Sequence, residues 1–170
     1  PPPDPYATSA TDPNAPPPAD PNAPPPAPGP STKLEVAQEE LVAALEQLAA
    51  GTRLNIIFFS DGVEAVAPSL LSLDDDRRQS LIGYVRSTRP LSSTALVPAM
   101  RTAMMLSARR IVLLSDGHGN VGGHDGELLR DAREAMRGGL RIDTVGLGSG
   151  QNAELLSTLA AESGGLYQSF

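Results

Sequence analysis

Residues 110–123 read RIVLLSDGHGNVGG, an apolar, β-prone run that ends in Ser-Asp-Gly and a glycine-rich loop. A short, almost continuously apolar run such as Arg110–Ser115 is typical of a strand buried in a parallel sheet. Ligands of parallel α/β sheets bind outside the carboxyl ends of the strands. We therefore expect Ser115, Asp116 and Gly117 to lie at a binding edge of the molecule.

The segments around this run alternate between helical and strand-like patterns. Thr32 and Glu35 form a capping-box pattern, and apolar residues at helical spacing then continue to Leu48 before Gly51. Further expected helices are a segment that begins near Ser72 and ends before Pro90, and residues 94–108, 127–137 and 151–163. Further expected strands are residues 53–60, 63–67, 140–147 and 166–170. This alternation predicts an α/β fold, a doubly wound, mostly parallel, Rossmann-like sheet with helices on both faces.

The amino-terminal residues differ in composition from the rest of the chain. Residues 1–30 hold fourteen of the seventeen prolines, and residues 12–19 and 20–27 both read DPNAPPPA. Proline runs favour solvated polyproline II, so we expect a disordered, low-complexity linker over 1–30 and one domain over 31–170. The linker is interpreted as a spacer, and the alternative is a ligand for a groove that binds proline-rich segments. Because the chain starts at Pro1, we expect a fragment, a processed form or a trimmed form.

Composition excludes several classes of protein. The chain has no cysteine, a net charge of −7 and no long apolar run, which argues against a disulfide scaffold, nucleic-acid binding and membrane insertion.

Ser115 lacks the G-x-S-x-G context of a nucleophile. Gly146–Gly150 lacks the full G-x-G-x-x-G spacing and is interpreted as a strand-to-helix turn. We identify no catalytic residues and expect no enzymatic activity.

Two oxygen-bearing side chains are candidate metal ligands. The loop 90–94 (PLSST) places Thr94 at the start of a helix, and Asp116 follows a strand. A hydroxyl and a carboxylate on neighbouring loops suit a hard cation such as Mg²⁺. The alternative is structural, in which Thr94 caps its helix and Asp116 forms an Asx-turn. His118 and His124 lack a third ligand for zinc and are expected to be exposed loop residues.

From Lys33 to Phe170 the chain resembles a von Willebrand factor type A domain. The matching stretches are KLEVAQEELVAALEQL (33–48), RLNIIFFSDGVEAV (53–66), Thr94, IVLLSDG (111–117), GLRIDTVGLG (139–148) and LLSTLAAESGGLYQSF (155–170). The resemblance implies a sheet of strand order 3-2-1-4-5-6 and a module for protein–protein recognition or adhesion rather than an enzyme. It also implies Mg²⁺ or Mn²⁺ at a metal-ion-dependent adhesion site built from three loops.

The resemblance assigns only part of that site to this chain. Thr94 matches the second loop and Asp116 the third, whereas APPPAPGP (23–30) stands where the family has Asp-x-Ser-x-Ser. It therefore implies a degenerate site that holds Mg²⁺ weakly at most. The expected binding surface is formed by loops 60–69, 90–94 and 116–125, and its candidate residues are Asp61, Ser93, Gly117 and the strand-end residue Ser115.

The proline-rich segment also stands where the family has its first, central strand. Three outcomes are open: residues 53–60 pair directly with residues 110–115, a partner donates the strand, or the recorded chain is incomplete. The expected function is binding of a protein partner, with an extracytoplasmic or cell-envelope location favoured. The alternative is an inert structural or assembly scaffold. A nucleotide-dependent enzyme would need a phosphate loop after the first strand, where this chain has proline.

Overall fold

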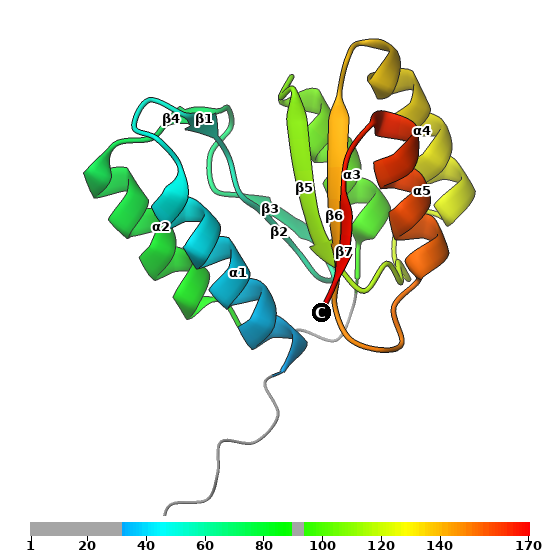
Figure 1. The fold of residues 1–170 in the computed structure, drawn as a ribbon, viewed down its shortest axis with the longest axis horizontal. Coiled ribbons are helices and arrows are strands. Elements are labelled where there is room, and N and C mark those ends of the chain that lie inside the picture. The colour runs from blue at the N-terminus through cyan, green and yellow to red at the C-terminus, as the bar shows by residue number, and fades with distance from the viewer. Residues whose placement is uncertain (1–31, 90–93) are drawn as a thin grey trace, which may run out of the picture. The chain divides into compact units, whose positions relative to one another are not determined.

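A computed structural model describes residues 32–89 and 94–170 (Figure 1). The expected linker over residues 1–30 and the candidate residue Ser93 lie outside the described residues. Ser31–Phe170 forms one compact unit. Within the described ranges, no helix is both long enough and apolar enough to cross a membrane.

The carboxyl-terminal half of this unit contains a parallel sheet. Its strands are β5 (Arg110–Ser115), β6 (Arg141–Gly146) and β7 (Tyr167–Ser169), hydrogen-bonded in the order β5-β6-β7 (Figure 1). The register pairs Arg110 with Arg141 and Ser115 with Gly146. The α/β fold class and the strand expected over 110–115 are therefore confirmed.

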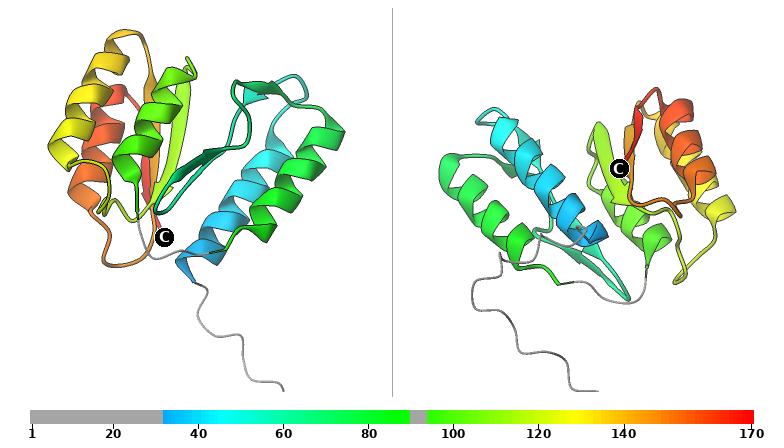
Figure 2. Two further views of the ribbon diagram at one scale, coloured as in Figure 1. Left: turned by 180° about the vertical axis from the view of Figure 1, so that it is seen from behind. Right: turned by 60° about the horizontal axis from the view of Figure 1, so that its bottom comes forward.

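Three helices cover the face of this sheet that carries Ile111, Leu113 and Ile142. They are α3 (Leu96–Met105), α4 (Asp125–Arg137) and α5 (Ala153–Ser163), and Figure 2 shows them grouped beside the strands. Together with the sheet they form one apolar core, whose fully buried members include Leu96, Leu128, Ile142, Leu156 and Leu159. Burial of these side chains supplies the main stabilisation of this half, at roughly 1.5–3 kcal/mol for each large apolar side chain.

The amino-terminal half has a core of its own. Helices α1 (Lys33–Gln47) and α2 (Asp75–Ser87) pack together, and this core includes Val42, Leu45, Leu81, Val85 and Ile56. The predicted capping box begins α1: the Glu35 backbone N–H donates to the Thr32 hydroxyl at 3.2 Å, and the Thr32 N–H donates to the Glu35 carboxylate at 2.7 Å. Helix α2 is capped by the Asp74 side chain, which accepts from the Arg77 N–H.

The single strand expected over residues 53–60 is not formed. Residues 53–59 instead contain β1 (Arg53–Leu54) and β2 (Ile57–Phe59), which pair antiparallel with β4 (Leu71–Ser72) and β3 (Val63–Ala65). Asn55 interrupts the run because its side-chain amide binds Ala67 through both its donor and its acceptor atoms. The returning strand expected over 63–67 is present as β3.

Strand β5 therefore has β6 as its only partner among the described strands. The described strands form three separate sheets, and direct pairing of residues 53–60 with residues 110–115 is not the arrangement formed. The Arg141 N–H donates to the Arg109 carbonyl, and the Leu147 N–H donates to the Ser115 carbonyl. The backbone groups of the odd-numbered residues of β5 therefore face β6. The backbone groups of Arg110, Val112 and Leu114 consequently face the opposite edge.

Candidate functional site

The loop that follows β5 is held by its own side chains. The Gly117 N–H donates to the Ser115 hydroxyl at 3.0 Å, and the His118 N–H donates to Asp116 Oδ1 at 3.1 Å. The second contact is an Asx-turn, the structural alternative considered for Asp116. Gly117 has a φ of +76°, which favours glycine. Ser115 and Gly117 are buried, so they shape this loop and leave little surface for a partner.

Asp116 is paired with a lysine from a distant part of the chain. Nζ of Lys33, the first residue of α1, lies 3.0 Å from Oδ2 of Asp116. The aliphatic part of Lys33 lies over Gly148, where a Cβ atom would approach Lys33 Cε to 2.7 Å. Gly148 therefore provides the space through which Lys33 reaches Asp116.

The electrostatic environment keeps Asp116 ionised. Partial burial disfavours the charged carboxylate, but the His118 N–H and the Lys33 ammonium outweigh it and hold the pKa of Asp116 below its ordinary value. Both oxygens of the carboxylate have a donor, since Oδ1 accepts from His118 and Oδ2 from Lys33.

Thr94 lies beside the same loop and is bound there through its backbone. Its N–H donates to the Asn120 side chain at 2.8 Å, and its carbonyl accepts from the Asn120 N–H at 3.0 Å. The structural alternative, in which Thr94 caps its helix, is wrong, because α3 begins at Leu96 and Ala95 stands at the N-cap position without a side-chain hydrogen bond.

Asp61 is brought to this region by the residue that follows Thr94. The Ala95 N–H donates to the Ser60 carbonyl at 2.6 Å, and the Ser60 hydroxyl donates to Asp61. Asp61 is exposed. These bonds connect three loops in one region, which we call the carboxyl edge: residues 60–61, 94–95 and 116–121, together with Lys33 and Gly148.

Sequence reasoning missed Lys33, Asn120 and Asn152 at the carboxyl edge. Asn152 caps α5 by accepting from the Leu155 N–H, and its own N–H donates to the Asp116 carbonyl at 2.7 Å. An Asn before a helix is a recognisable cap signal. No local pattern marks Lys33 or Asn120, because their partners lie 83 and 26 residues away.

Among the described residues of the carboxyl edge, the Asp116 carboxylate already has a cationic partner in Lys33. Mg²⁺ takes six oxygen ligands in near-octahedral geometry. Here Asp116 supplies one carboxylate, and its counter-charge is already the Lys33 ammonium. Among the residues that the structure describes, no three His, Asp or Glu side chains gather in a way that could hold a metal.

Comparison with known proteins relates the chain to one family. The model of the von Willebrand factor type A domain matches residues 29–169. Inter alpha-trypsin inhibitor heavy chain 4 of Mus musculus is 26% identical over 148 residues, which are 79% of this chain and 16% of that protein. Inter-alpha-trypsin inhibitor heavy chain H3 of Rattus norvegicus is 26% identical over 147 residues, or 78% of this chain and 17% of that protein. The chain thus spans a small part of these relatives.

Solved structures show the same fold. A von Willebrand factor type A protein from Catenulispora acidiphila superposes with a TM-score of 0.70 at 21% identity, covering 81% of this chain and 34% of that chain. Proximal thread matrix protein 1 from the mussel byssus, with a zinc-occupied MIDAS motif, superposes with a TM-score of 0.62 at 14% identity, covering 81% and 39%. Domains of this kind are generally protein-interaction modules. By the extent of the family match and by its fold, the chain belongs to the von Willebrand factor type A domain family.

Proposed function

We propose that this chain is a protein-recognition module whose carboxyl edge works without a divalent cation. The observation that carries the proposal is the contact of 3.0 Å between the Lys33 ammonium and the Asp116 carboxylate. The ammonium supplies the positive charge beside the carboxylate that a bound cation would otherwise supply. The adhesion site is degenerate on this proposal, since Thr94 and Asp116 stand without the Asp-x-Ser-x-Ser loop.

A built-in ammonium differs from a metal ion in what it offers a partner. A divalent cation has coordination positions that a partner carboxylate can fill, whereas a lysine ammonium offers only hydrogen-bond donors. The partner therefore binds the carboxyl edge by hydrogen bonds and shape. Exposed residues of its loops, such as Asp61 and Asn120, supply the contacts.

Calorimetric titration of the chain with Mg²⁺, Mn²⁺ and Ca²⁺ tests the proposal. We expect no binding, or binding with a Kd in the millimolar range, on the order of −4 kcal/mol or weaker. Micromolar binding that disappears in Asp116→Asn would overturn the proposal, because it would show a working metal site. Micromolar binding that persists in Asp116→Asn would belong to another part of the chain and leave this edge cation-free.

Residues 1–30 act as a proline-rich spacer for the domain over residues 31–170, in a protein of the cell envelope or the extracytoplasmic space. Fractionation of cells that produce the full-length protein tests this location. Recovery in the cytoplasmic fraction alone would contradict it.

A further inference from the structure

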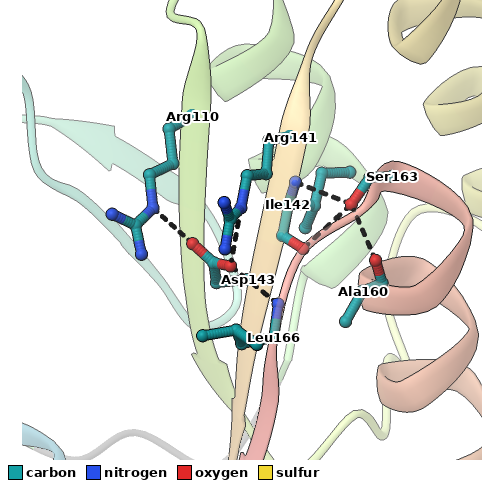
Figure 3. Close-up of polar contacts among 7 residues, drawn as sticks. All are labelled: Arg110, Arg141, Ile142, Asp143, Ala160, Ser163 and Leu166. Carbon is teal, nitrogen blue, oxygen red and sulfur yellow. Dashed lines mark hydrogen bonds and ion pairs between the residues drawn. The ribbon is translucent and has the colours of Figure 1, made fainter.

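Two arginines on neighbouring strands share one buried carboxylate. Arg110 and Arg141 stand opposite each other in the register of β5 and β6. Arg141 Nε donates to Asp143 Oδ1 at 3.2 Å, and Arg110 Nε donates to Oδ2. The Leu166 N–H also donates to Oδ1, at 2.7 Å. Figure 3 shows both guanidinium groups turned toward Asp143 from the two strands.

The charges in this group do not balance. Two guanidinium groups face one carboxylate, which leaves an excess of one positive charge in a chain whose net charge is −7. Within the described part of the chain, neither arginine has a second carboxylate within 4 Å. Each arginine uses its Nε, and no described group accepts from the Nη atoms of either one. An arginine guanidinium has five N–H donors, so most of the donors here are available.

These donors are accessible and held in place. The Asp143 side chain is 7% exposed, whereas the side chains of Arg110 and Arg141 are 59% and 43% exposed. The buried carboxylate therefore fixes the inner side of each guanidinium and leaves its outer side in solvent. A fixed guanidinium loses less conformational entropy when it binds an anion than a freely rotating one does.

Exposed apolar side chains flank the two arginines. Val112 pairs with Asp143 in the sheet register and is 52% exposed, and Leu166, whose N–H binds Asp143, is 62% exposed. Guanidinium groups bind planar carboxylates through two parallel hydrogen bonds. A cationic pair with apolar residues beside it suits an acidic segment that also carries apolar side chains.

We propose that Arg110 and Arg141 form an oxyanion-binding site, and that its occupant is a carboxylate side chain of an acidic, partly apolar segment of a partner protein. The partner class rests on the proposed recognition function, whereas the oxyanion site rests on the arginine geometry alone. Arg110 is the first residue of β5 and Asp116 follows its last residue, so this site lies at the opposite end of the strand from the carboxyl edge. The two sites can therefore fail independently.

Titration of the full chain with short peptides tests the site. The probe is acetyl-Glu-Val-Glu-Val-amide, its control is acetyl-Gln-Val-Gln-Val-amide, and inorganic phosphate is a third ligand. The readout is the NMR shift of the Arg110 and Arg141 Nε–Hε signals. We expect the acidic peptide to shift both signals at a concentration about tenfold lower than either other ligand. Equal response to phosphate and the acidic peptide would keep an oxyanion site but overturn the peptide as its occupant.

Variants separate the site from general charge effects. Arg141→Gln is expected to weaken binding of the acidic peptide about tenfold, and Arg141→Lys to weaken it less, because lysine keeps the charge but loses the fork. The matched control is Arg130→Gln on α4, whose arginine is 70% exposed and already pairs with Asp131. An unchanged affinity in both Arg141 variants, or an equal loss in Arg130→Gln, would overturn the proposal. If Arg141→Gln fails to fold, Arg141→Lys and Arg110→Lys still give the comparison.

Discussion

Nζ of Lys33 lies 3.0 Å from Oδ2 of Asp116, across 83 positions of the sequence. The contact joins the start of α1 to the loop that follows β5. The buried residues of α1 belong to one apolar core, and those of β5 belong to the other. Gly148 makes room for it, so three distant segments meet at one ion pair. At the carboxyl edge of this chain, the Asp116 carboxylate is therefore neutralised by an internal salt bridge.

Replacing Lys33 by Met is expected to destabilise the domain only slightly. The lysine side chain is half exposed, so loss of the ion pair costs about 0.2–1 kcal/mol at neutral pH. The pKa of Asp116 lies below its ordinary value in the folded state, so this stabilisation is present above the unfolded-state pKa and is lost as pH falls through the folded-state pKa. Urea denaturation of both proteins at pH 7 and below about pH 4 measures this.

Lys33→Arg is the matched control, because it keeps a cation near Asp116. We expect its free energy of unfolding to stay closer to the wild-type value than that of Lys33→Met. A Lys33→Met penalty that does not shrink at low pH would show that Lys33 acts through packing on Gly148 and not through its charge.

Asp143→Asn is expected to be more costly than loss of the Lys33 pair. Burial opposes ionisation of Asp143, but the Leu166 N–H, Arg110 and Arg141 together hold its pKa below the ordinary value. The neutral side-chain amide of the Asp143→Asn variant cannot balance the charge of two guanidinium groups. We therefore expect the free energy of unfolding to fall by about 1–3 kcal/mol. Because the folded-state pKa is lowered, the penalty should fade as the medium is acidified. Thermal unfolding measures it, with Asp75→Asn as the exposed control.

Backbone amides of β5 should exchange with solvent in an alternating pattern. Odd-numbered residues of this strand bond to β6, and even-numbered residues face the edge that no strand of the described residues covers. We expect slow exchange at Ile111 and Leu113 and exchange faster by orders of magnitude at Val112 and Leu114. Hydrogen exchange followed by NMR gives the rates. Uniform protection along β5 would mean that a further strand covers this edge in solution.

Two glycine-to-alanine substitutions should have opposite effects. A Cβ atom at Gly165 would lie 1.8 Å from the Ile142 carbonyl oxygen, so Gly165→Ala forces the chain before β7 away from β6 and should cost about 1–3 kcal/mol or more. Gly126 lies within α4, and a Cβ atom placed on it would have no neighbouring group within 4 Å. Gly126→Ala should therefore stabilise the domain by about 0.5–1 kcal/mol. Circular dichroism melts compare the two. Equal effects of both variants would contradict the close approach at Gly165.

Local signals in the sequence were sufficient where a structure depends on neighbours within a few residues. The capping box of Thr32 and Glu35 begins α1 as predicted, and Arg110–Ser115 forms a strand with the predicted bounds. The helix expected over 127–137 is present from Asp125, with Glu127 bonded back to the His124 N–H. These features follow from the sequence because their energies come from adjacent residues.

Sequence reasoning was less reliable where a polar side chain competes with a local pattern. The run 53–60 has the composition of one strand, yet the Asn55 amide binds the backbone of Ala67 and divides it. Thr94 is a residue type that often caps helices, yet its backbone binds Asn120 and the helix begins two residues later. In both cases a hydrogen bond over more than ten residues replaces the local one.

The sequence by itself determined the α/β class, the bounds of β5 and the position of Asp116 at the end of that strand, because these follow from periodicity and strand-end position along the chain. Only the tertiary structure decided that Lys33 pairs with Asp116 and that Arg110 and Arg141 share Asp143. The pairs Lys33–Asp116 and Arg110–Asp143 join residues 83 and 33 positions apart, and the energy of an ion pair depends on a distance in space that residue spacing does not encode.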